Sequence, residues 1–307
     1  MAGNGEDERD PFGGYGYDLL SRALAGCARE GFSGALRVNG SPGGTFHLRS
    51  GLVVAVESPG APSPQALLLR SGRITGEQWE RLVDESRGAR WPAEALIAHG
   101  YAGTAQLGLV CVMALQDAAF AVVAGRIGGC ERVAHSKPLA PVALGEPPQR
   151  VLGDAARKVL AVTELPHPVR PDRERPVPGS QASVSSRLST LRNELLDHAD
   201  GRRSARDLAF CVGRGLYPVT VEIGWMLGEG LLRCTGAPAP VPVLLPADGR
   251  GVQPREPTPD PLRQPLPAPA ALPRRRPGSS GITEVRPPRR SGPTWKDFFR
   301  LRHPTAD

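Results

Sequence analysis

The sequence predicts an α+β fold: a small antiparallel sheet with packed helices, followed by a second, mainly helical domain and a disordered tail. Three observations lead to this prediction. Short apolar runs separated by glycine turns, between residues 34 and 57, are typical of consecutive antiparallel strands. Apolar residues at helical spacing flank these runs on both sides. Residues 237–290 contain fifteen prolines in 54 positions and too few hydrophobic residues to form a core.

The first domain is predicted over residues 15–136, after a disordered polar segment at residues 1–14. Apolar residues at helical spacing predict a helix over 17–29, which Gly31 ends. Three strands are then expected, joined by turns that contain glycine, because glycine accepts positive φ angles at low cost. These strands occupy residues 34–39, 45–48 and 52–57.

A helical insertion follows the three strands. Thr75 and Thr104 each come after a loop and before an apolar periodic run, so both are predicted to be helix N-caps. Residues 121–133 are expected to return to extended structure around Gly128 and Gly129. The predicted helices span residues 65–69, 75–86, 93–99 and 104–120.

Prolines separate the first domain from a second one. Residues 137–181 are predicted to be a proline-rich linker that contains one short helix at 151–163. The second domain, residues 182–236, returns to globular composition, and Ser204 and Asp207 have the spacing of a capping box. Its expected elements are helices at 188–199, 204–212 and 218–229 and an extended segment at 230–234.

Two glycine-containing stretches in the first domain resemble a known family. They are Gly31-Phe32-Ser33-Gly34-Ala35-Leu36-Arg37-Val38 and Phe46-His47-Leu48-Arg49-Ser50-Gly51-Leu52-Val53-Val54-Ala55, and both follow a leucine-rich helix. Together they resemble the PATAN domain, a small α+β module of bacterial signalling proteins. The resemblance implies a non-catalytic domain for interaction or signalling.

Residues 72–118 resemble, more locally, the N-terminal domain of type II secretion ATPases. The matching stretches are Gly72-Arg73-Ile74-Thr75 and Ala95-Leu96-Ile97-Ala98-His99-Gly100-Tyr101. Some members of that family bind cyclic dinucleotides through an arginine and a glycine ahead of the equivalent leucine. Here Trp91-Pro92-Ala93 precede Leu96, so neither residue is present. We therefore expect a pair of helices that packs on the sheet, and no nucleotide cofactor.

The second domain resembles a winged helix–turn–helix, with residues 204–209 in its second helix and 219–227 in its third. In DNA-binding members the third helix reads bases in the major groove with basic or amide side chains. Here that helix has no basic residue and two glutamates, so phosphate contacts would have to come from elsewhere in the domain. The candidate DNA contacts are Arg202, Arg203, Arg206 and Arg214. DNA binding and protein contacts both stay open as uses of this domain.

The positive charge of the chain lies in its tail. The net charge is +7, and residues 237–307 contain twelve Lys/Arg and six Asp/Glu. Residues 237–290 are predicted to be disordered, and residues 291–303 to form a short amphipathic helix that docks on this chain or on a partner. The candidate docking residues are Trp295, Phe298, Phe299 and Leu301. Alternatively, the basic residues around this helix would allow weak contact with an anionic membrane surface.

The sequence contains no motif for catalysis, metal binding or cofactor binding. It lacks the Walker A, GxGxxG, GxSxG and HExxH patterns, and its six histidines are not at ligand spacing. The apolar run 107–123 includes Gln116 and Asp117, which predicts a buried helix and no membrane span. We expect this pair to bond backbone groups within its domain; the alternative is a functional pocket. Five separated cysteines without a CxxC pair predict reduced thiols and a cytoplasmic location.

Two functions are expected from these observations. The first is a non-enzymatic bacterial regulatory protein, similar to transcription regulators, whose winged helix contacts DNA. The second is a signalling adaptor whose winged helix and C-terminal aromatic motif bind only proteins.

Overall fold

The computed structural model describes residues 14–134, 136–182 and 188–234. Several predictions concern residues outside these ranges. They are the disordered segment before Gly14, the proline-rich tail at 237–290 and the docking helix at 291–303, with Trp295, Phe298, Phe299 and Leu301. The remaining predictions can be compared with the structure element by element.

The predicted small antiparallel sheet is confirmed, and with it the α+β class. Its strands are β1 (Gly34–Ser41), β2 (Gly44–Arg49), β3 (Leu52–Glu57) and β4 (Arg126–Val133), in the order β3-β2-β1-β4. All neighbouring strands are antiparallel. The turns depend on glycine as expected, because Gly43 and Gly51 have φ angles of 66° and 78°.

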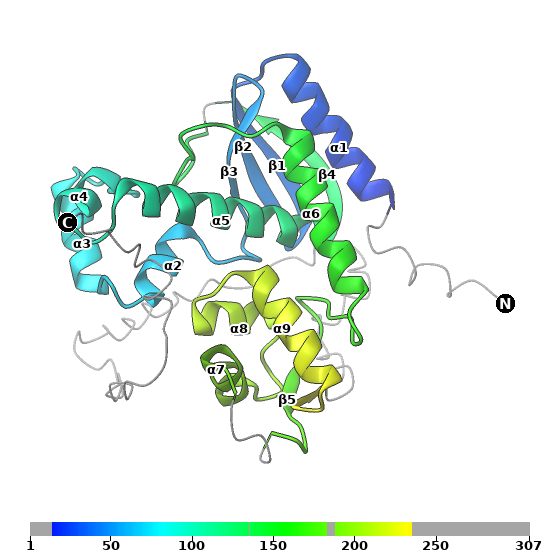
Figure 1. The fold of residues 1–307 in the computed structure, drawn as a ribbon. Helices are drawn as coiled ribbons and strands as arrows, with labels where there is room; N and C mark the ends of the chain where they lie inside the picture. Colours follow the sequence, from blue (N-terminus) through cyan, green and yellow to red (C-terminus); the bar gives the residue numbers. More distant parts are fainter. Residues whose placement is uncertain (1–13, 135, 183–187, 235–307) are drawn as a thin grey trace, which may run out of the picture. The chain divides into compact units, whose positions relative to one another are not determined.

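Three helices pack on one face of this sheet (Figure 1). They are α1 (Gly14–Arg29), α5 (Thr104–Val123) and α6 (Pro148–Thr163). Alternate strand residues such as Leu36, Phe46 and Leu48 are buried in the same core as Leu20 and Leu24 of α1. This pattern is that of a sheet whose side chains alternate between its two faces.

Helices α2 (Pro64–Arg70), α3 (Gly76–Glu85) and α4 (Ala93–Ala98) form a smaller core of their own. Trp79 and Leu96 are buried there with Leu107 and Val110 of α5. The pair α3 and α4 therefore packs against α2 and the first half of α5, away from the sheet (Figure 1). The prediction that this pair packs on the sheet is wrong, because the length of α5 places its N-terminal half beyond the strands.

The second half of the described chain contains three helices and a strand pair. These are α7 (Thr190–His198), α8 (Ala205–Val212), α9 (Leu216–Gly228), β5 (Pro176–Pro178) and β6 (Leu232–Cys234). Strands β5 and β6 are antiparallel. The helices bury Leu195, Leu208 and Ile223 between them. The capping box is confirmed at α8, where Asp207 accepts a hydrogen bond from the Ser204 backbone and Ser204 accepts one from Asp207.

Two local predictions need correction, and a third is confirmed. Helix α5 continues to Val123, so only residues 126–133 of the expected extended stretch form a strand. Thr104 is the first residue of α5 and not its cap; the cap position is Gly103, whose N–H donates to Gln106 at 3.0 Å. Thr75 does cap α3 as predicted.

The segment predicted as a linker, residues 137–181, takes part in the folded core. Helix α6 is longer than the expected 151–163 and buries Val151, Leu152 and Val159. Val169 is also buried, and β5 pairs with β6. The prolines of this segment therefore interrupt secondary structure without releasing the chain from the core.

Candidate functional site

The four candidate DNA contacts lie at opposite ends of helix α8. Arg202, Arg203 and Arg206 surround its N-terminus, whereas Arg214 follows its C-terminus. Arg203 donates to the His198 carbonyl at 3.1 Å and forms an ion pair with Asp200 at 3.3 Å. The structure therefore does not gather the four arginines into one basic ridge.

The solvent-facing side of α9 carries no positive charge. Pro218, Trp225 and Glu229 are exposed and Glu222 is partly exposed, at spacings that place all four on one side of the helix. Trp225 keeps 45% of its surface exposed. This side is therefore apolar and acidic, in contrast to a helix that approaches phosphates.

Arg192 of α7 holds both glutamates of α9. Its Nε lies 2.5 Å from Glu222 Oε1, and its Nη1 and Nη2 lie 2.5 Å and 3.0 Å from the two carboxylate oxygens of Glu229. The paired carboxylates, Glu229 first, raise the pKa of the Arg192 guanidinium. One arginine thus fixes two acidic side chains and leaves this surface with an excess of negative charge.

The N-terminus of α9 is capped by a residue of α5. Asp117 is buried, and its Oδ1 accepts a hydrogen bond from the Tyr217 backbone N–H at 3.2 Å. The cap position of α9 itself is Gly215, which has no side chain to do this. A Cβ at Gly215 would lie 2.1 Å from Asp117 Oδ2, so a residue without a side chain is needed here to leave room for the carboxylate.

Aromatic and charged groups complete this junction between α5, α6 and α9. Phe120 and Tyr217 meet edge to face with ring centroids 5.4 Å apart, and Lys158 Nζ lies 5.3 Å from the centre of the Tyr217 ring. Burial raises the pKa of Asp117 and lowers that of Lys158, while their mutual attraction opposes both shifts. The prediction that Asp117 bonds a backbone group is confirmed, but the expectation that this group lies in the same predicted domain is wrong, because the bond joins α5 to α9 and residues of both helices lie in one core.

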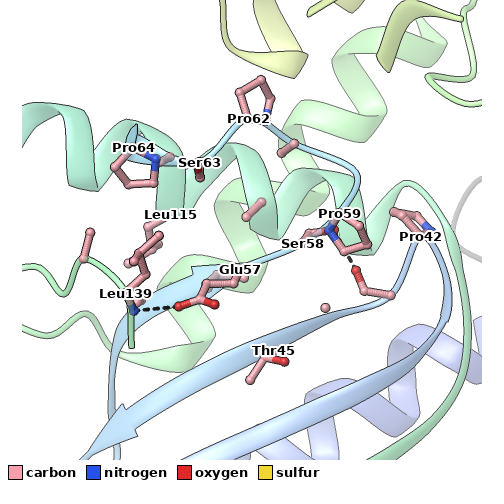
Figure 2. A pocket seen from close by; sticks show the side chains of 18 of the residues that line it. Pro42, Thr45, Glu57, Ser58, Pro59, Pro62, Ser63, Pro64, Leu115 and Leu139 are labelled. Carbon is pink, nitrogen blue, oxygen red and sulfur yellow. Dashed lines mark hydrogen bonds between the residues drawn. The ribbon is translucent and has the colours of Figure 1, made fainter. Parts of the chain in front are cut away.

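A groove of about 670 Å³ lies beside the end of β3 (Figure 2). One wall consists of sheet residues, among them Arg37, Thr45 and Glu57, and another of α5, with Ala114, Leu115 and Ala118. The proline-rich loop between β3 and α2 contributes further lining residues: Pro59, Pro62 and Pro64. The sequence analysis did not find this groove, because its residues come from segments far apart in the chain.

Glu57 is held in place at the groove. Its Oε1 accepts a hydrogen bond from the Leu139 N–H at 2.8 Å and lies 3.3 Å from Nε2 of the buried His47 (Figure 2 shows the contact with Leu139). The His47 Nε2 contact is at ion-pair distance but is not aligned as a hydrogen bond, and Nδ1 has no partner among the described residues. The imidazole, and secondly the Leu139 amide, lower the pKa of Glu57.

Neither the described residues nor comparison with known proteins assigns a chemical activity. Among the residues that the structure describes, no group of three or more His, Cys, Asp and Glu side chains is placed to hold a metal ion. Within the same ranges only α5 is long and apolar enough to cross a membrane, and two thirds of its apolar window is buried in the protein. No family model, curated protein or solved structure matches this chain.

Proposed function

We propose that this chain is a non-enzymatic bacterial signalling adaptor that binds protein partners. In this proposal the first domain is PATAN-like and the second is a winged helix–turn–helix used for protein contacts. The observation that carries it is the exposed side of α9, where Trp225 lies between Glu222 and Glu229 and the single arginine that contacts both, Arg192 of α7, leaves an excess of negative charge. A half-exposed tryptophan is a typical centre of a protein-binding surface.

The position of α9 also favours protein contacts over DNA contacts. A reading helix must enter the major groove with its exposed side. The other side of α9 is covered by the protein. A Cβ at Gly224 would lie 2.6 Å from the Leu165 side chain, and Asp117 and Lys158 contact the first turn of the helix. The side that remains exposed would bring Glu222 and Glu229 towards phosphates.

The rigid attachment of α9 suits an adaptor. Because Asp117 caps α9 from α5 and Phe120 packs against Tyr217, the partner-binding helix is joined to the first domain through buried contacts. A partner on the Trp225 surface would therefore be held in a defined orientation to the first domain. The C-terminal aromatic segment, with Trp295 and Phe298, remains part of this proposal as a second docking element.

Two comparisons with the full chain test the proposal. Trp225→Ala should abolish capture of a partner protein from native lysate, while Leu160→Ala, a change at another exposed apolar residue, should preserve it. Duplex DNA retarded by the basic tail at low salt should be retarded equally by the Arg202→Gln, Arg206→Gln double variant. The proposal fails if Trp225→Ala leaves capture unchanged, or if the double variant loses DNA binding.

A further inference from the structure

The groove beside β3 has the size of a small-molecule site. Its volume of about 670 Å³ lies within the range of several hundred Å³ that is usual for pockets that bind drug-sized ligands. About half of its lining is apolar, and the apolar part includes α5 and the proline-rich loop as well as sheet residues such as Val38 and Val56. Such walls favour an apolar ligand body over water.

The strand register sets one charged row along the sheet side of this groove. Arg37 is paired with Thr45 across β1 and β2, and Thr45 is paired with Glu57 across β2 and β3. Residues in register across antiparallel strands project from the same face. Because Arg37 and Thr45 alternate with the buried Leu36 and Phe46, this row lies on the face of the sheet opposite to the one that the helices cover, and α5 lines the groove beside the edge strand β3.

The charges along the groove favour an anion. Glu57 is engaged by the Leu139 amide and by His47, and Arg90, which forms no hydrogen bond or ion pair with any described residue, contributes its charge to the lowered pKa of Glu57. Arg37 has only a long contact of 3.8 Å to Glu131, with more than half of each side chain exposed. Pairs of this kind contribute little, so both arginines can turn to a ligand. Among the described residues that line the groove there are thus two arginines and one carboxylate, and the carboxylate already has partners.

We propose that this groove binds a free, amphipathic small molecule with an anionic head and an apolar body. Arg37 and Arg90 contact the anionic head, and Ala114, Leu115 and Ala118 of α5 contact the apolar body. This site is separate from the α9 surface, and the proposal stands whether or not α9 binds a protein.

Titration of the full chain with decanoate, followed by NMR, tests this proposal. Decanoate should shift the amide signals of Thr45, Glu57 and Leu115, and decyltrimethylammonium, of equal chain length and opposite charge, should not. Arg37→Gln and Arg90→Gln should each weaken decanoate binding about three- to fivefold. Arg81→Gln, on the exposed side of α3 and outside the groove, is the matched control and should leave binding unchanged.

Glu57→Gln should have the opposite effect on binding, because it removes the only carboxylate among the described residues that line the groove. Decanoate should then bind about two- to threefold more tightly. The proposal is overturned if decanoate does not bind, if the cationic amphiphile binds equally well, or if neither arginine matters. It is also overturned if the chain instead co-sediments with phosphatidylglycerol vesicles through Arg37 and Arg90, since these residues would then contact a membrane surface.

Discussion

Replacement of Asp117 by alanine should lower the free energy of unfolding by about 2–3 kcal/mol. The first turn of α9 would lose the acceptor of the Tyr217 N–H, and Gly215 offers no replacement. Loss of a capping side chain costs about 0.5–2 kcal/mol, and a buried donor left without a partner adds about 1–3 kcal/mol. Relief of the cost of burying the carboxylate offsets part of this loss, which leaves the stated magnitude.

Asp117→Asn keeps an oxygen that can cap α9 but removes the negative charge. The asparagine oxygen can still accept from the Tyr217 N–H, but the charge that attracts Lys158 is gone. We expect a loss of about 1 kcal/mol or less for this variant, because removal of a buried negative charge offsets the weakened attraction. The two variants therefore differ mainly by the backbone hydrogen bond.

Urea unfolding of the full chain at pH 7, followed by circular dichroism, measures both effects. In thermal unfolding of the same chain each kcal/mol corresponds to about 2–4 °C in Tm, so Asp117→Ala should unfold roughly 5–10 °C below the wild type. Equal losses for alanine and asparagine would show that the cap contributes nothing. A loss below about 0.5 kcal/mol for alanine would refute the junction described above.

Two further predictions concern Gly215 and Glu57. Gly215→Ala should destabilise the chain by about 1–3 kcal/mol in the urea unfolding assay, because the added Cβ would collide with Asp117. The matched control Gly108→Ala, at an open position on α5, should stabilise the chain by about 0.5–1 kcal/mol. A gain in stability at both sites would contradict the packing at Gly215. Because the folded pKa of Glu57 lies below its ordinary value of 4.5, its stabilising effect is present above that pH and is lost as the pH falls through the folded pKa. The difference in unfolding free energy between wild type and Glu57→Gln should therefore shrink in acid, and a difference that grows on acidification would be inconsistent with the contact to His47.

Local signals in the sequence were sufficient for most of the individual elements. Thr75 and Ser204 each form a cap with a residue three positions further along the chain, and both caps are present in the structure. The same is true of Gly43 and Gly51, whose positive φ angles form the hairpin turns. In each case the residue that carries the signal and the backbone that responds to it are close in the chain.

Non-local contacts account for what the sequence analysis missed. The hydrogen bond from Tyr217 to Asp117 spans 100 residues, and nothing in either local pattern identifies the other. Strand β5 begins and ends with proline, which lacks an N–H and therefore suggested a linker. Proline is tolerated on an edge strand, and β5 pairs with β6 alone in its sheet of two strands. The groove likewise exists only because β3, α5 and the proline-rich loop converge.

The composition of α5 follows from the number of elements that it contacts. A helix segment that is apolar on all sides must be covered on all sides. Helix α5 contacts α2, α6, α9 and the sheet, and from Ala114 to Val123 every residue except Gln116 is buried, whereas Leu109 nearer its N-terminus is exposed. Its residues towards the groove, Ala114 and Ala118, are small, and a larger side chain there would fill the space that a ligand would need. Asp117 lies between them in sequence but points to α9. A single helix therefore lines the proposed ligand groove and anchors the proposed partner-binding helix.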